Sequence, residues 1–419
     1  MINLLFLFTC LVVCISGHQF DRMQSTLIED MEIEKELKLI NKVPIKSIHT
    51  KFGYIVDCID INNQPAFNHP LLKNHTLQRH PNFRITDRIN RRNSTKITST
   101  KAIFGLRKNK CPTGSVPIKR ATKDDLIRGK SYFNNGLVDH IHGNHVCFYL
   151  YLIFLNTCHY IILISTINSY IEICFQYAEV ISYPRYDFYN GVSGTSSVYN
   201  VKIRKGQSSS AVMYIRNGPD STSYIGMGWH IAPDLYNDDD THFYVVWTAD
   251  NFKNTGCFNH LCPGFVQTSK KDYLGGNIGA TSIYGGHMVE MTYSISQDPE
   301  TKNWVISNES EMLGYFPASL FPNMAQAHQV GWGGRTSNSQ GGPSPQMGSG
   351  YFPDKVFTHS SYFKDVAFQV ESKGSVFPYI QDVDAVSDRP DCFYARYYGL
   401  LEEVGYSLQF GGPGGSCGG

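Results

Sequence analysis

The stretch MVEMTYSIS, Met288 to Ser296, alternates between apolar and polar side chains along its whole length. The residues on its apolar side are Val289, Met291, Tyr293 and Ile295. A period of two residues predicts a strand with one buried face. Similar β-type stretches are VYNVKIRKG (198–206), SSAVMYIRNG (209–218), THFYVVWTAD (241–250), NWVISN (303–308) and KDVAFQVESKG (364–374). Many short strands separated by glycines predict a mainly β, antiparallel β-sandwich for residues 177–419.

Composition agrees with this fold class and excludes one class of partner. The chain has 419 residues, enough for two or three domains, and 37 Gly, 26 Tyr and 25 Phe, which suit strands and turns. Its 37 basic and 36 acidic side chains are nearly balanced. Without a basic excess, the chain is not expected to bind nucleic acid.

The N-terminal end indicates export from the cell. Residues 1–17 form an apolar run that ends in small residues, as in a cleaved signal peptide, so we expect a secreted, extracellular protein. Asn74, Asn93 and Asn308 lie in N-x-Ser/Thr sequences that fit glycosylation of a secreted chain. Secretion permits disulfides, and three bridges are plausible among the cysteines outside residues 1–17 and 146–176, with their pairing left open.

Residues 18–135 form a separate unit, expected to be a small α+β domain. The stretch FGYIVDCIDI (52–61) is dense in β formers and predicts a strand. A helix is predicted to begin at Thr122, with Asp125 three residues later as its capping partner.

Between the two units, residues 146–176 are unusually apolar. The part from 146 to 166 carries no formal charge and is long enough to cross a bilayer. However, polar residues interrupt it and no positive cluster flanks it, so membrane contact is expected only if this part is a genuine helix. Its Phe-, Tyr-, Ile- and Asn-rich composition is typical of a translated AT-rich intron, and our hypothesis is a retained intron.

The stretch VGWGGRTS, Val330 to Ser337, holds a tryptophan among three glycines. This pattern suggests a tightly shaped backbone that presents Arg335 to a cleft.

Several long motifs together resemble the plant neprosin-type proteins, whose founding member is a secreted glutamic peptidase that cuts after proline. The N-terminal unit resembles the neprosin activation peptide through GYIVDCIDINNQPAFNHPLLKNH (53–75) and CPTGSVPIKRATKDDLIRG (111–129). The C-terminal unit resembles the peptidase domain through GWHIAP (228–233), YVVWTADNFKNTGCFNHLCPGFVQTS (244–269), GYFPASLF (314–321), GWGG (331–334), DRPDC (388–392) and FGGPGGSCGG (410–419). The resemblance implies the bridges Cys58–Cys111, Cys257–Cys262 and Cys392–Cys417.

The resemblance also implies where catalytic residues should lie. In the family, one glutamate stands in an I-E-A-G-W motif and the other in W-G-G-E. Here the motifs read IGMGW, ending at Trp229, and WGGR, so Gly226 and Arg335 occupy the glutamate positions. Glycine has no side chain, and arginine stays cationic and serves as neither acid nor base. The sequence therefore predicts a neprosin-like protein without peptidase activity.

Other functions remain open at this stage. One alternative is an active acid endopeptidase that uses displaced carboxylates, either Glu290 or the run Asp238 to Asp240. Another is a cell-wall protein that binds an extended proline-rich peptide or a glycan, and a last one is the product of a decayed gene. The residues predicted to line a binding groove are Trp229, Trp332, Tyr315, Phe316 and Gln267. We expect neither a metal nor another cofactor, and the oligomeric state stays open.

Overall fold

The computed structural model describes residues 30–85, 98–106, 109–134, 173–182, 188–217, 222–339, 342–371 and 374–417. The region 1–17, with the predicted signal peptide, lies outside them, and so does most of the apolar segment, 146–172. No helix among the described residues is long and apolar enough to span a membrane.

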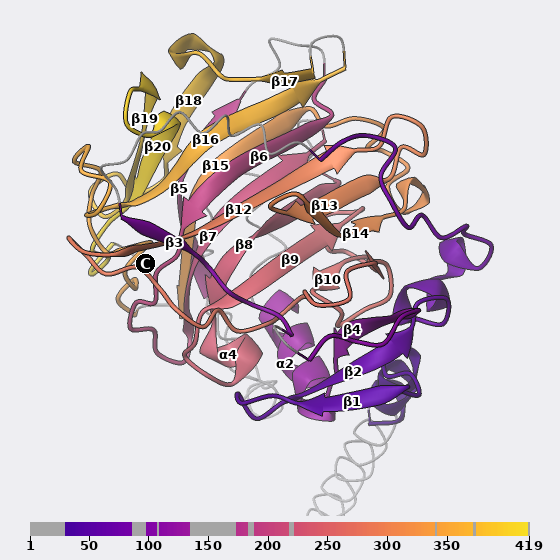
Figure 1. The fold of residues 1–419 in the computed structure, drawn as a ribbon. Coiled ribbons are helices and arrows are strands. Elements are labelled where there is room, and N and C mark those ends of the chain that lie inside the picture. Colours follow the sequence, from indigo (N-terminus) through magenta and orange to yellow (C-terminus); the bar gives the residue numbers. More distant parts are fainter. Residues whose placement is uncertain are drawn as a thin grey trace, which may run out of the picture.

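Two large sheets pack face to face, which confirms the predicted sandwich (Figure 1). The first has seven strands, in the order β10 (Cys257–Phe258), β9 (His242–Thr248), β8 (Tyr224–Ile231), β7 (Gln207–Arg216), β15 (Gln329–Ser339), β5 (Ile173–Ser182) and β18 (Val383–Ser387). Neighbouring strands in it are antiparallel.

The second sheet has ten strands. Eight follow the order β11 (Val266–Gln267), β14 (Glu311–Phe316), β13 (Trp304–Asn308), β12 (Met288–Gln297), β6 (Gly191–Ser197), β16 (Ser361–Val370), β20 (Gly405–Gly411) and β19 (Tyr394–Leu401). The other two are β17 (Gly374–Val376), which pairs with β16, and β3 (Ser99–Lys101), which pairs with β12. Short helical turns connect strands at α4 (Pro233–Tyr236), η4 (Ala318–Leu320) and η5 (Ile380–Asp382).

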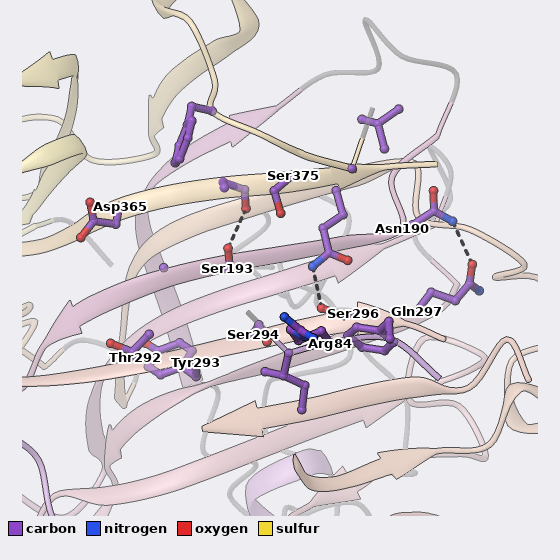
Figure 2. A pocket seen from close by; sticks show the side chains of 18 of the residues that line it. Arg84, Asn190, Ser193, Thr292, Tyr293, Ser294, Ser296, Gln297, Asp365 and Ser375 are labelled. Atoms are coloured by element: carbon purple, nitrogen blue, oxygen red, sulfur yellow. Dashed lines mark hydrogen bonds between the residues drawn. The ribbon is translucent and has the colours of Figure 1, made fainter. Parts of the chain in front are cut away.

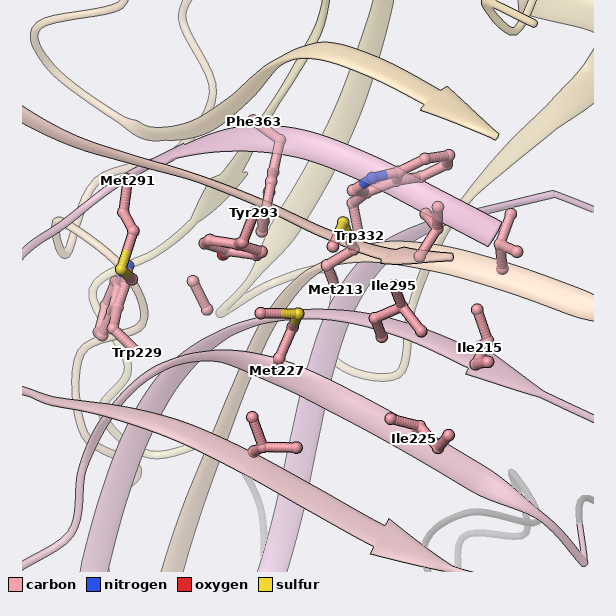
Figure 3. Close-up of a cluster of buried hydrophobic side chains, with 14 of the residues drawn as sticks. Met213, Ile215, Ile225, Met227, Trp229, Met291, Tyr293, Ile295, Trp332 and Phe363 are labelled. Carbon is pink, nitrogen blue, oxygen red and sulfur yellow. The ribbon is translucent and has the colours of Figure 1, made fainter. Parts of the chain in front are cut away.

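The core between the sheets comes from the alternation read in the sequence. On β12, the side chains of Val289, Met291, Tyr293 and Ile295 are all buried. Figure 3 shows Met291, Tyr293 and Ile295 in one cluster with Ile225, Met227 and Trp229 of β8 and with Trp332 of β15. Burial of so many large apolar side chains is the dominant stabilising contribution to a sandwich of this size.

The N-terminal unit is a small α+β structure that continues into the sandwich. Its sheet has the order β1 (Lys46–His49), β2 (Ile55–Asp60) and β4 (Ser115–Lys119), and its helices are residues 30–40, η1 (Pro65–Asn68), η2 (Pro70–Leu72) and α2 (Lys123–Asn134). Leu72 and Phe104 of this unit are buried in the main core, where the Phe104 ring stacks on Phe243 with 4.5 Å between ring centroids. The unit thus completes the core rather than merely resting on it.

The three disulfides implied by the resemblance are present. Cys58–Cys111 links the N-terminal unit internally, Cys257–Cys262 closes a short loop, and Cys392–Cys417 ties the C-terminal end to the sandwich.

Strand β5 begins inside the segment assigned to the insertion. Gln176 is buried, donates from Nε2 to Asn338 Oδ1 at 2.9 Å, and accepts from the hydroxyl of Thr336 at 3.0 Å. Residues 173–176 therefore belong to the folded sheet.

Candidate active site

The two positions that the resemblance assigns to catalytic glutamates lie on one face of the seven-stranded sheet. Ile225 and Met227 point into the core, so position 226 of β8 faces outward. On β15 Trp332 points inward, and Arg335, three residues later, faces outward. The stretch around Trp332 is thus a regular central strand, and the expected tight backbone is wrong.

Arg335 is held in place by a carboxylate on the neighbouring strand. Its Nε donates to Glu179 Oε1 of β5 at 2.6 Å. The other carboxylate oxygen, Oε2, accepts from the hydroxyl of Tyr214 at 2.8 Å. The Glu179 side chain is 6% exposed and that of Arg335 is 26% exposed. Both oxygens of the carboxylate are therefore engaged inside a nearly closed site.

Two tyrosines complete this cluster. The guanidinium carbon of Arg335 lies 5.1 Å from the ring centroid of Tyr214 and 5.5 Å from that of Tyr224, and the two rings stack at 5.4 Å. A cation over aromatic faces is favourable, and more so away from water. Arg335, Glu179, Tyr214 and Tyr224 are hereafter the arginine cluster.

Electrostatics shift the pKa values of Arg335 and of the two tyrosines upward. Burial lowers the pKa of Arg335, but the Glu179 carboxylate and the tyrosines outweigh it, and the pKa ends well above its usual value. Burial, with Glu179 adding to it, raises the pKa of Tyr214 well above 10. Burial likewise raises the pKa of Tyr224, to about 12, although Arg335 opposes the shift. Neither tyrosine is a ready proton donor in acid or neutral solution.

At position 226 the space for a side chain is taken. A Cβ placed on Gly226 would lie 2.5 Å from the hydroxyl oxygen of Tyr224 and 2.7 Å from its ring. A glutamate there requires Tyr224 to move out of the cluster.

Helix α2 of the N-terminal unit covers the outer face beside the cluster. The Tyr132 hydroxyl lies 3.1 Å from His230 Nε2 of β8, and its ring packs edge-on against Phe258 at 5.5 Å. Burial, assisted by His242, lowers the pKa of His230 to about 3. The helix begins as predicted, because Thr122 and Asp125 cap each other at its first turn.

The residues predicted to line a groove do not do so. Trp229 and Trp332 are fully buried between the sheets, where their indole N–H groups donate to the Ser197 and Ser193 carbonyls. Phe316 is equally buried and packs 5.6 Å from Trp247. The structure contradicts a groove-lining role for these three.

Tyr315 and Gln267 are also buried, but under the N-terminal unit. The Tyr315 hydroxyl lies 2.9 Å from His75 Nε2 and accepts from Gln78 N at 2.9 Å. Gln267 is bracketed by Gln64, which accepts from its backbone N–H at 2.7 Å and donates to its carbonyl at 3.1 Å. Neither side chain is open to a ligand in this structure.

The displaced carboxylates considered from the sequence lie elsewhere. Glu290 is on the outer face of the other sheet, where it pairs with Lys364 at 2.7 Å. Asp238 follows α4 and contacts His242 Nε2 at 2.7 Å. Glu179 is not among the residues predicted from the sequence. Its place in the apolar stretch YAEV (177–180) does indicate a partner, because a buried acid in a central strand needs one.

The glycosylation positions differ in exposure. Asn74 is exposed, whereas Asn308 is half-buried with its amide 3.5 Å from Asp272 Oδ2. Asn93 lies outside the described residues.

Among solved structures, the chain is similar to scytalido-glutamic peptidase with a peptide-based transition-state analog, at 11% identity and a TM-score of 0.30, over 56% of this chain and 96% of that one. It is similar to SCP-B, a member of the eqolisin family of peptidases in complex with the tripeptide Ala-Ile-His, at 10% identity and a TM-score of 0.29, over the same shares. It is also similar to a Bacillus licheniformis beta-glucanase, at 13% identity and a TM-score of 0.22, over 39% of this chain and 67% of that one.

Family models match most of the chain in the expected order. Residues 47–146 match the Neprosin activation peptide and residues 205–413 match Neprosin. The first match ends where the apolar segment begins. The chain belongs to the neprosin family, with an activation-peptide region followed by a peptidase-like β-sandwich.

Proposed function

We propose that this protein keeps the fold of a glutamic peptidase but does not cleave peptides. The observation that carries the proposal is the replacement of both family glutamates, by Gly226 and by the ion-paired Arg335. Peptide hydrolysis by two carboxyl groups needs one to take a proton from water and the other to donate a proton to the substrate. Loss of one such group typically costs about 10²–10⁴-fold in rate, and here both are lost.

Glu179 is the one carboxylate of the arginine cluster, and it does not restore the missing chemistry. A general base must have a free oxygen within hydrogen-bond reach of the attacking water. The oxygens of Glu179 instead accept from Arg335 and Tyr214. Its nearest candidate acids are Tyr214 and Tyr224, whose raised pKa values make them poor proton donors in acid.

The test is an acid proteolysis assay on the secreted full chain, with a proline-containing peptide as substrate, between about pH 2 and pH 7, where carboxyl dyads operate. We expect no cleavage above a buffer control. The matched variant is Glu179→Gln, which retains the shape of the side chain but not its charge. Cleavage by the unaltered protein that this variant abolishes would refute the proposal and make Glu179 a catalytic residue.

A second variant tests whether the protein could still bind and cleave a peptide if both family glutamates were restored. Gly226→Glu and Arg335→Glu restore the two family positions, but the structure shows that two neighbours must change with them. Tyr224→Ser removes the collision with the new Cβ, and Glu179→Val removes a third carboxylate that would otherwise face the new pair. Cleavage by this fourfold variant alone would mean that the lost glutamates explain the inactivity.

We also propose that the protein is secreted. Three disulfides are typical of oxidising compartments, with which the apolar N-terminus and the exposed Asn74 agree. Expression in a plant secretory system should yield a chain that begins near His18 and shifts in mobility after deglycosylation. Retention of residues 1–17 in an intracellular product would contradict this.

A further inference from the structure

A groove lies on the outer face of the ten-stranded sheet, on the opposite side of the sandwich from the arginine cluster. It has a volume of about 560 Å³. Its floor comes from β6, β12 and β16, and its sides come from residues 83–85 of the N-terminal unit and from β17 with Phe377 (Figure 2). This volume lies within the range of small-ligand sites.

The floor is built from short, uncharged polar side chains. Across β6 and β12, Thr195 stands opposite Thr292 and Ser193 opposite Ser294. The hydroxyls of the threonine pair lie 2.8 Å apart. Further along, Gln369 of β16 donates to the Ser296 hydroxyl at 2.7 Å. Because these side chains are short, the sheet surface is hollow here.

Some hydrogen-bonding capacity in the groove is unused. The Ser294 hydroxyl, which Figure 2 places on the floor, has no partner among the described residues. At one end, Asn190 donates to Gln297 Oε1 at 3.0 Å, but its own Oδ1 is buried without a partner. Because this oxygen is shielded from the surface, the Ser294 hydroxyl is the group of the two that a ligand can reach.

Most of the backbone of the floor is not available to a ligand. Strands β6 and β12 are paired on both sides over the groove, and β16 is paired with β6 and, at Phe368–Val370, also with β17. An extended peptide that binds by adding a strand needs a free sheet edge. Recognition here therefore rests on side-chain hydroxyls and amides, which both donate and accept.

Charge does not select the ligand. The charged residues that line the groove are Arg84, Lys302, Glu309, Asp365 and Glu371. They carry both signs, and two of them, Lys302 and Glu371, approach each other at 3.8 Å. Glu309 is held by Lys101 at 2.9 Å. A strongly anionic or cationic polymer finds no complementary field.

One side of the groove offers an aromatic face. Phe377 is 40% exposed, and its ring is stacked almost parallel on Tyr406 at 4.8 Å, which fixes its orientation. A fixed, half-exposed ring beside hydroxyl and amide groups suits a ligand with apolar C–H faces and many hydroxyls. We propose that this groove binds a segment of a neutral polysaccharide.

Affinity electrophoresis of the full chain tests this, with xyloglucan, galactomannan and mixed-linkage β-glucan as probes and polygalacturonate as the charged comparison. We expect retardation by at least one neutral probe. Ser294→Lys, which fills the floor without breaking a hydrogen bond in the protein, and Phe377→Ala should each weaken binding at least about tenfold. The matched control, Ser319→Lys, places the same substitution at an exposed position of η4, outside the groove, and should bind as the unaltered protein does.

Three results would overturn the proposal: no retardation by any neutral probe, retardation by polygalacturonate alone, or equal retardation of the unaltered protein and both groove variants. Thermal melting of every variant confirms that the fold is kept. Failure here leaves the proposed inactivity untouched, because the groove and the arginine cluster lie on opposite faces of the sandwich.

Discussion

Glu179→Leu should destabilise the protein through the cation that it leaves behind. Arg335 would keep its charge but lose the carboxylate 2.6 Å from its Nε, and the Tyr214 hydroxyl, in a 1% exposed residue, would lose its acceptor. Removal of one partner of a buried ion pair costs about 3–5 kcal/mol. Because 26% of the Arg335 side chain still meets solvent, we expect the lower end, about 3 kcal/mol.

The measurement is a double-mutant cycle by thermal unfolding. A loss of about 3 kcal/mol lowers the melting temperature by about 6–12 °C for a domain of 150–250 residues. Glu179→Leu with Arg335→Met removes both charges, and should recover most of the loss, to within about 1 kcal/mol of the unaltered protein, since apolar replacements of buried pairs are often nearly neutral. The two single changes are therefore strongly non-additive.

The control for this cycle is an exposed pair. Lys101 and Glu309 lie 2.9 Å apart, but their side chains are 73% and 36% exposed. Glu309→Leu should cost less than about 1 kcal/mol. If Glu179→Leu costs no more than this control, or if its effect simply adds to that of Arg335→Met, the arginine cluster is not the closed ion pair described above.

Three further predictions concern the rest of the fold. Burial lowers the pKa of His260 to about 4, whereas in the unfolded chain its pKa is about 6.5. Between these two pH values the unfolded chain binds one more proton, so the free energy of unfolding falls as the pH drops, by up to about 1.4 kcal/mol per pH unit. His260→Phe should remove this contribution to the pH dependence of unfolding. Phe104→Ala should cost about 3–5 kcal/mol in chemical denaturation, because it empties a site in the main core against Phe243; a smaller loss would mean that the N-terminal unit is only loosely attached. Replacement of Cys392 and Cys417 by alanine should cost about 3 kcal/mol, since their bridge spans 25 residues; unchanged melting would refute this.

The sequence predicted the sandwich where its alternation was clear. In β12 the apolar residues at 289, 291, 293 and 295 face the core as expected. The alternation does not predict strand β6 (Gly191–Ser197), because Gly, Ser and Thr carry little apolar signal. The strand predicted for VYNVKIRKG (198–206) is wrong, since these residues form no strand. The packing explains the small residues of β6. Gly194 lies against Trp332 and Phe363 on the inner side of the strand, and Ser193 faces the groove on the outer side.

The sequence identifies two positions of the candidate site but not the side chains that surround them. The resemblance assigns Gly226 and Arg335 to the glutamate positions, and in the structure both face outward from the seven-stranded sheet. The spacing within each motif explains why the tryptophans do not share the outer face. Gly226 and Trp229 are three residues apart, as are Trp332 and Arg335, so on a strand the two members of each pair point to opposite sides of the sheet. Glu179 was missed because its partner is 156 residues away, a pairing that only the sheet order discloses.

The arginine cluster also determines what a glutamate at either of the two family positions would meet. A single return to glutamate at 226 meets the Tyr224 hydroxyl. A glutamate at position 335 would place two carboxylates side by side, its own and that of Glu179. If Glu179 is replaced before Arg335, the arginine keeps its charge but loses its ion-pair partner. Each single change thus disturbs a neighbouring side chain and still gives only one of the two acids. The four residues of the arginine cluster are therefore expected to change together rather than one at a time, because each is packed against or hydrogen-bonded to another of the four.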